Sequence, residues 1–217
     1  MNPLGMRAHR KPARKAWVAL GLLFVAGGSY WFGTHGNPNA RFRAGDVVDE
    51  LDGVAIRYNG GIHAAHGRNR TADGYNVGIR YQCVEFVKRY LLERHGHRMP
   101  DAYGHARDFY DPRLPDGGWN ARRAMVQHAN GGAAKPAKGD LVVFGPWLFN
   151  RYGHVAIVAS VSGHAVEIAQ QNPGPWGRTR VGYPLACREN RWFIEHRRVL
   201  GWLRLPAGQD QNPGGPI

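Results

Sequence analysis

The chain has little cysteine and a shortage of negative charge. Its 217 residues include two cysteines, Cys83 and Cys187, which lie far apart and form neither a Cys-x-x-Cys pair nor a disulfide framework. A structural zinc site built on cysteines is therefore not expected. Asp and Glu number 16 against 29 Lys and Arg, which gives a formal net charge of +13. This balance suits an anionic neighbour such as a phospholipid surface or a cell-wall polymer.

Motifs for nucleic-acid and metal binding are also lacking. The basic residues are spread along the chain and are not grouped with aromatic residues, so no nucleic-acid partner is expected. The histidine pairs in His63-Ala-Ala-His66 and His95-Gly-His97 lack a third ligand at zinc spacing. We therefore expect no metal and no other cofactor.

Charge is absent from residues 16–33. These eighteen residues span about 27 Å as a helix, which is enough to cross a bilayer core. Trp17 lies at one end and Tyr30-Trp31 at the other, as aromatic residues do at membrane interfaces. The basic segment 1–15 carries five cations and predicts a cytoplasmic N-terminus.

Residues 16–33 are interpreted as a single-pass signal-anchor in the inner (cytoplasmic) membrane. The rest of the chain would then lie in the periplasm or another extracytoplasmic space. The alternative is a cleaved signal peptide with small residues at Ala26-Gly27-Gly28, followed by secretion. Residues 34–44 are expected to form a linker, residues 45–205 one domain, and residues 206–217 a disordered tail.

Cys83 begins a helix with one apolar stripe. Val84, Val87 and Leu91 recur at helical spacing, and Gly96 is the expected C-cap. The stripe leaves Glu85, Lys88, Arg89 and Glu93 on the other faces. The free N–H groups at a helix start favour a thiolate, which is the nucleophilic form of cysteine. The alternatives are a buried core cysteine and a disulfide with Cys187.

The other expected elements come mostly from short patterns. Residues 45–51 and 120–128 predict short helices, and Asn59-Gly60 predicts a hairpin between residues 54–58 and 62–65. Residues 68–78 predict a loop. A helical turn is expected at 106–110, and strands at 141–144, 153–161, 165–172 and 199–205. One long helix followed by consecutive antiparallel strands indicates an α+β fold.

His154 is the candidate base, because it starts a strand between Gly153 and an apolar run. A three-residue turn at 162–164 would pair Val161 with Ala165 and place His154 opposite Asn172 and diagonal to Gln170. A two-residue turn would bring Glu167 and Gln171 to that face instead. We prefer the first register, because it also aligns the apolar residues of the two strands.

Four motifs together resemble the CHAP domain, the cysteine, histidine-dependent amidohydrolase/peptidase family of the NlpC/P60-like, papain-like superfamily. They are Tyr81-Gln-Cys-Val-Glu-Phe86, Pro136-x-x-Gly-Asp-Leu-Val-Val-Phe144, Gly153-His-Val-Ala-Ile-Val158 and Ile168-Ala-Gln-Gln-Asn172. The resemblance covers roughly residues 45–205 and is strongest to the amidase domain of glutathionylspermidine synthetase/amidase. It implies a papain-like fold in which the nucleophile helix packs on an antiparallel sheet, here preceded by one transmembrane helix.

The resemblance also implies the catalytic residues. Cys83 would be the nucleophile, His154 the base and then the acid, and Gln170 the residue that orients the histidine, with Asn172 also lining the site. Gln170 is a departure, because the most similar relatives carry Glu there. The Gln82 side chain and the Tyr81 hydroxyl are candidate oxyanion donors beside the backbone N–H of Cys83.

These features predict an anchored extracytoplasmic cysteine amidohydrolase or endopeptidase that acts on peptidoglycan stem peptides. One alternative is a small-molecule amidase of the glutathionylspermidine type. The other is a catalytically impaired module that binds wall peptides or a protein. The oligomeric state is left open.

Overall fold

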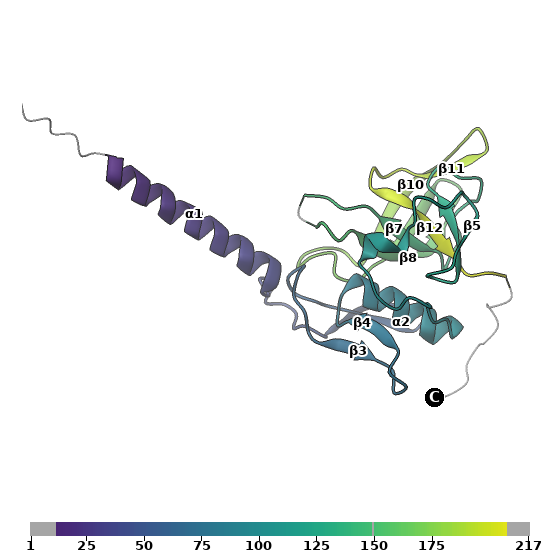
Figure 1. Ribbon diagram of the computed structural model, residues 1–217, viewed down its shortest axis with the longest axis horizontal. Helices are drawn as coiled ribbons and strands as arrows, with labels where there is room; N and C mark the ends of the chain where they lie inside the picture. The colour runs from purple at the N-terminus through teal and green to yellow at the C-terminus, as the bar shows by residue number, and fades with distance from the viewer. Residues whose placement is uncertain (1–11, 149, 208–217) are drawn as a thin grey trace, which may run out of the picture.

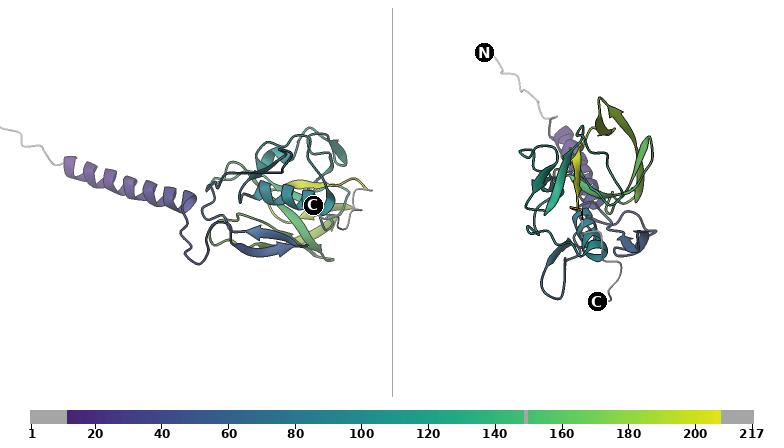
Figure 2. Two further views of the ribbon diagram at one scale, coloured as in Figure 1. Left: turned by 90° about the horizontal axis from the view of Figure 1, so that it is seen from below. Right: turned by 90° about the vertical axis from the view of Figure 1, so that its right-hand side faces the viewer.

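The computed structural model describes residues 12–148 and 150–207 (Figure 1). Helix α1 (Pro12–His35) extends away from a body formed by the later residues (Figure 1, Figure 2). Its side chains from residue 16 to residue 32 are exposed, and the segment Ala16–His35 is long and apolar enough to cross a membrane. The expected apolar helix is therefore present, as a signal sequence or a single anchor. The predicted basic segment 1–15 and tail 206–217 lie largely outside the described residues.

The body is built on an eight-stranded sheet in which every pairing is antiparallel. Its order is β11-β10-β9-β8-β7-β12-β6-β5. The strands are β5 (Gly118–Asn120), β6 (Met125–Ala129), β7 (Leu141–Phe144), β8 (His154–Val161), β9 (Ala165–Ala169), β10 (Arg180–Arg188), β11 (Arg191–Ile194) and β12 (Val199–Arg204).

Helix α2 (Cys83–His95) packs on one face of this sheet, so the predicted α+β arrangement is confirmed. Leu141 and Val143 of β7 point toward α2, whereas Val142 and Phe144 point into a second core on the opposite face. This alternation is the two-residue period of a strand. Because both faces are covered, β7 is apolar throughout and not alternately polar.

The predicted boundaries of α2 are confirmed, but its polar positions are not all exposed. The helix begins at Cys83 and ends at His95, and Gly96 is the C-cap with a left-handed φ of 62°. Glu85 and Lys88, which we assigned to the outer faces, are each 2% exposed. They are buried because a small hairpin, β3 (Arg68–Arg70) with β4 (Asn76–Ile79), covers that side of α2, where we had expected a loop.

The predicted helix at 45–51 and the hairpin at Asn59-Gly60 are both wrong. Residues Val47–Leu51 form β1, which pairs with β2 (Val54–Arg57) through the turn Asp52-Gly53. Both turn residues have positive φ, 50° and 83°, which a two-residue hairpin of this type requires. The Asn59 side chain is buried and donates to the carbonyl of Gly61 at 2.8 Å, so it stabilises a loop.

The predicted helix at 120–128 is also wrong, because β5 and β6 form a hairpin there. Strand β6 pairs with β12, and this long-range pairing outweighs the local helical pattern. Strands β10 and β11 lie in a region, between residues 172 and 199, for which we predicted no helix or strand. The short helix η1 (Ala106–Phe109) lies where the helical turn was expected.

The pairing of β8 with β9 differs from the predicted pairing near the turn but agrees with it near His154. Val161 pairs with Val166 and not with Ala165, so the connection is longer than the three residues expected. A β-bulge at Ala159 then shifts the register by one residue, and Ile157 pairs with Ala169. Beyond the bulge, the alignment is therefore the preferred one, which directs His154 toward the residues after Ala169.

Candidate active site

The Cys83 sulfur lies at the start of α2, against the sheet. Cys83 is 8% exposed, and the backbone N–H groups of Val155, Val84 and Cys83 itself hydrogen bond to the sulfur. Because Val155 directly follows His154, the thiol lies beside the first residues of β8. Burial nevertheless raises the pKa of the thiol to about 11, and these hydrogen bonds only partly oppose it. The expectation that the helix start favours the thiolate is thus not met in the free protein.

His154 is held by the side chain of Gln170. The ring Nε2 lies 2.8 Å from Gln170 Oε1, while Gln170 Nε2 donates to the carbonyl of Arg178 at 2.8 Å. Because the amide nitrogen is used by that carbonyl, the amide oxygen must face the histidine and accept its Nε2 proton. The neutral ring therefore carries its proton on Nε2, and Nδ1 is left as the basic nitrogen.

His154 is neutral over a wide pH range. Burial lowers its pKa to about 4; the hydrogen bond that His154 donates to Gln170 Oε1 opposes this, and the Arg198 cation adds to it. A carboxylate at position 170 would stabilise the imidazolium, whereas the amide orients the ring without adding charge. The resting pair is accordingly a thiol and an imidazole.

The hydrogen bonds of the Asn172 side chain go to Ile62 and to Gln82, the residue before Cys83, although Asn172 lines the same cavity as His154. The φ of 57° at Asn172 turns the chain away from the direction of β9. Its Nδ2 donates to Gln82 Oε1 at 2.7 Å and to the Ile62 carbonyl at 2.9 Å. Asn172 Oδ1 is buried and has no hydrogen-bond partner among the described residues. The two predicted orienting residues thus have different contacts.

The two candidate oxyanion donors have different positions. Gln82 lines the cavity that contains Cys83, but its Nε2 donates to the Ala64 carbonyl at 2.6 Å. The Tyr81 ring packs near His66, with ring centroids 5.6 Å apart, and does not line that cavity. Of the predicted donors, the backbone N–H of Cys83 is therefore the one next to the sulfur.

Gln171 supports the site from behind. The preferred register placed its side chain on the face of the sheet opposite to that of His154. It is fully buried, and its Nε2 donates to the Gln82 carbonyl at 3.0 Å and to Glu85 Oε2 at 2.8 Å. Its Oε1 accepts the N–H of Arg57 at 2.7 Å. Gln171 thus joins the end of β9 to the first turn of α2, which fixes Cys83 relative to His154.

Cys83 and His154 line one cavity of about 810 Å³. One wall is the segment 102–106, and Arg68 and Arg151 supply cations. No Asp or Glu lies among the described residues that line it. Tyr30 and His35 of α1 also line it, together with Leu148. The cavity is therefore basic and reaches from the cysteine to the N-terminal helix.

The wall at 102–106 is held from behind by two buried cations. Lys88 donates to the Ala102 carbonyl at 2.9 Å, and burial lowers its pKa to about 8. Arg123, which is fully buried, donates to the carbonyl of Tyr103 at 3.1 Å and stacks on Phe109. No sequence pattern indicated these contacts, because each joins segments far apart in the chain.

The cysteines do not form the alternative disulfide. Both are free: Cys83 is buried, and Cys187 is exposed on β10. Cys83 is thus available as a thiol in the cavity.

The chain also matches known proteins over this region. Residues 72–172, which include Cys83, His154, Gln170 and Asn172, match the CHAP domain. This match confirms the predicted resemblance to the CHAP domain over residues 72–172.

Individual relatives are longer than this chain. Trypanothione synthetase of Crithidia fasciculata is 33% identical over 191 residues, which are 82% of this chain and 29% of that protein. The bifunctional glutathionylspermidine synthetase/amidase of Escherichia coli (strain K12) is 32% identical over 142 residues, 60% of this chain and 23% of that protein. The chain thus spans less than a third of either relative.

One solved structure, described as Ly7917 with the hydrolyzing product of MDP, is 30% identical. It matches over 35% of this chain and 30% of that chain, with a TM-score of 0.26. That TM-score is too low to support an inference about fold or substrate.

Proposed function

We propose that the body of this protein is a cysteine amidohydrolase, held by α1 at the extracytoplasmic face of the membrane. The observation that carries this proposal is the chain of contacts from Arg178 through Gln170 to His154, which makes Nδ1 the basic nitrogen of a histidine that lines the same cavity as Cys83. The match of residues 72–172 to the CHAP domain supports the same chemistry. The papain-like assignment is part of this proposal, since the cysteine helix precedes the histidine strand.

The proposed reaction has two steps. The thiol proton of Cys83 passes to His154 Nδ1 as the sulfur attacks the carbonyl carbon of the amide, and the Cys83 N–H donates to the developing oxyanion. The imidazolium returns its proton to the leaving amine, and the acyl group stays on sulfur as a thioester. Water, deprotonated by His154, then releases the carboxylic acid and regenerates the thiol.

The charge of the cavity favours an acidic peptide as the substrate. Arg68 and Arg151 line the cavity, and its described lining includes no carboxylate that could pair with a cationic polyamine. Peptidoglycan stem peptides carry carboxylates and occur outside the cytoplasm, where α1 would place the body. We therefore propose them as the substrate class.

Two alternative functions are each supported by a specific observation. The relatives that include glutathionylspermidine synthetase/amidase favour a glutathione–polyamine amide. The pKa values of about 11 for Cys83 and about 4 for His154 favour a module that binds wall peptides without efficient hydrolysis.

The test is hydrolysis of purified stem peptides and of glutathionylspermidine by the full chain in detergent, read by mass spectrometry. We expect the stem peptides to be cleaved, and Cys83→Ala and His154→Ala each to lower the rate at least 10³-fold. Binding of stem peptides without cleavage would establish the impaired module. Cleavage of glutathionylspermidine alone would establish the small-molecule amidase.

A further inference from the structure

The cavity that contains Cys83 is partly built by the apolar N-terminal helix. Tyr30 and His35 of α1 line it together with Leu148, which is 88% exposed. Tyr30 lies five residues before the end of α1, about 7.5 Å along its axis. If Ala16–His35 crosses a bilayer, this end of the cavity lies at the membrane interface, where tyrosine side chains are common.

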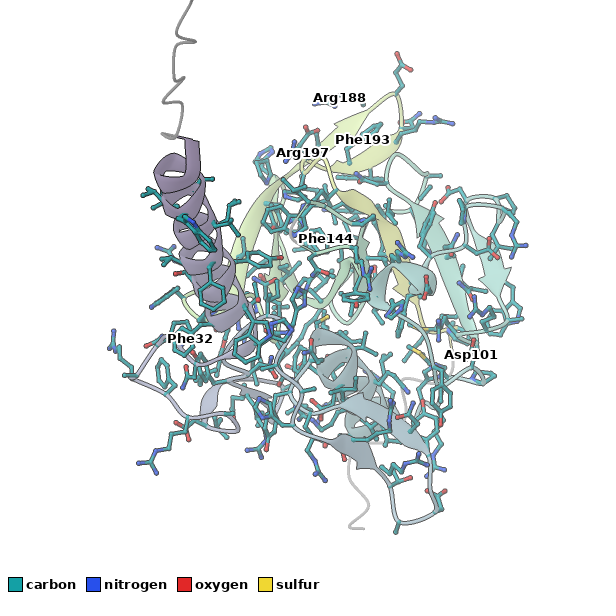
Figure 3. All side chains as sticks on the ribbon, turned by 60° about the vertical axis from the view of Figure 1, so that its left-hand side comes forward. Phe32, Asp101, Phe144, Arg188, Phe193 and Arg197 are labelled. Carbon is teal, nitrogen blue, oxygen red and sulfur yellow. The ribbon has the colours of Figure 1, made fainter. Side chains whose placement is uncertain are left out.

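The end of α1 is attached to the body by close backbone contacts. The N–H groups of His63 and Gly61 donate to the carbonyls of Thr34 and Gly36 at 2.7 Å and 2.6 Å. A Cβ at Gly61 would lie 2.4 Å from the Thr34 oxygen, so glycine is needed for this approach. Figure 3 shows the part of α1 that carries Phe32 against the loops of the body. The body is thus joined to the helix end without a free linker.

The same segment holds the catalytic region. The Ile62 carbonyl accepts from Asn172, and the Ala64 carbonyl accepts from Gln82, the residue before the nucleophile. Residues 61–64 therefore connect the helix end to the active site directly. The orientation of the cavity relative to α1, and hence to a bilayer, is set by this segment.

Apolar and basic side chains extend the same end of the cavity. Leu148 and Arg151 come from the connection between β7 and β8, which projects toward α1 (Figure 1). Trp176 is 71% exposed, and the residue before it, Pro175, accepts from Asn39 just beyond α1. Exposed apolar residues beside arginines suit a bilayer surface with anionic head groups.

We propose that the substrate is a peptide anchored in the same bilayer by a lipid, which enters the cavity at the end formed by Tyr30, His35 and Leu148. This inference rests on the proposed anchored hydrolase and adds its substrate class. A soluble peptide would have to reach the same cysteine at the crowded membrane surface, whereas a lipid-tethered peptide is already delivered at the depth of the opening.

The test uses the full chain reconstituted in phosphatidylethanolamine/phosphatidylglycerol vesicles. One stem tetrapeptide is supplied either free or coupled through a short linker to a dipalmitoyl anchor, and hydrolysis is read by mass spectrometry. The quantity is the ratio of kcat/KM for the tethered peptide to that for the free peptide. Confinement to a surface raises this ratio for any anchored enzyme, so the decisive comparison is with a variant that keeps α1 but loses its attachment.

That variant combines Gly61→Ala, whose Cβ would lie 2.4 Å from the Thr34 oxygen, with twenty Gly/Ser residues between Gly36 and Asn37. The matched control combines Gly163→Ala, which has open space around its Cβ, with the same insertion in the exposed turn between Glu189 and Asn190. We expect the ratio to fall at least tenfold in the first and to be unchanged in the second. Leu148→Asp is expected to lower the ratio at least fivefold, with Trp119→Asp, an exposed tryptophan on β5, as its control.

An unchanged ratio in the linker variant would overturn the proposed substrate class and leave the hydrolase intact. An intact mass showing that the membrane-bound protein begins after α1 would overturn it as well. Failure to cleave either peptide would instead refute the proposed function, and this inference with it.

Discussion

Replacing Gln170 by Glu should raise the population of the reactive thiolate–imidazolium pair. The new carboxylate would lie where Gln170 Oε1 now lies, 2.8 Å from His154 Nε2. An opposite charge at that distance raises a histidine pKa by about 1 to 3 units, from about 4 to between about 5 and 7. One unit corresponds to about 1.4 kcal/mol, so the imidazolium gains about 1.4 to 4 kcal/mol. The thiolate–imidazolium population should rise about 10-fold to 10³-fold.

The substitution also has a structural cost. Glu cannot donate to the Arg178 carbonyl as Gln170 does at 2.8 Å, and the loss of that bond should destabilise the fold by about 1 to 3 kcal/mol. A lower midpoint of thermal unfolding together with a more reactive cysteine is therefore the expected signature. A change that only loosened the site would lower stability without the pH-dependent gain in reactivity.

The assay is alkylation of the full chain by iodoacetamide between pH 5 and pH 9, with each cysteine followed by peptide mass. In the wild type, the exposed Cys187 should react before Cys83, whose pKa is about 11. In Gln170→Glu, Cys83 should react about 10-fold to 10³-fold faster near pH 7. Glu167→Gln, which changes one charge on the same strand outside the site, is the matched control. Equal Cys83 rates in folded Gln170→Glu and wild type would refute the reasoning.

Three further outcomes are expected. The free energy of unfolding should decrease by at most about 3 kcal/mol as pH falls from 6.5 toward 4, because His154 becomes protonated in the unfolded chain but stays neutral in the folded protein. Urea unfolding measures this decrease, and a His154→Gln variant should lose the pH dependence. Gly78→Ala should lower the free energy of unfolding by about 2 kcal/mol or more, since its φ is 147° and its Cβ would lie 2.8 Å from the backbone of α2. Gly163→Ala, with open space around it, should lower the same quantity by less than about 1 kcal/mol. Arg123→Met should remove hydrogen bonds to backbone carbonyls of the segment 101–108 and lower the free energy of unfolding by about 3 kcal/mol. Amide hydrogen exchange in that segment should become faster, and unchanged exchange would contradict the supporting role of Arg123.

The main elements of the site could be predicted from local patterns. The helical stripe after Cys83 and the apolar run after His154 each reflect short-range chemistry, and the structure has α2 and β8 at these places. The strand predicted at 165–172 is present as β9 but ends at Ala169, before the stop expected at Pro173. The pairing of His154 with Gln170 also followed from the period of a strand. It was predicted through the wrong turn, because the bulge at Ala159 compensates for the longer connection.

The wrong predictions concern short segments whose partners are distant. Residues 45–51 and 120–128 have too few apolar residues to distinguish a helix from a strand, and their pairing with β2 and with β5 and β12 decides the outcome. Strand β10 is mostly exposed or half-buried and contains Pro184, so it has no clear alternation. Its pairing with β9 and β11 makes it a strand.

The sequence by itself was sufficient to predict the candidate residues Cys83 and His154, because a cysteine at a helix start and a histidine at a strand start are local features. The tertiary structure alone decided the surroundings of these residues. Burial, which depends on the whole fold, raises the pKa of the Cys83 thiol, where we had expected a thiolate. The turn at Asn172 directs the Asn172 side chain to Gln82 and not to His154. The depth of the cavity and its contact with α1 also arise from segments brought together by folding, since a short sequence pattern holds no information about solvent exclusion or distant neighbours.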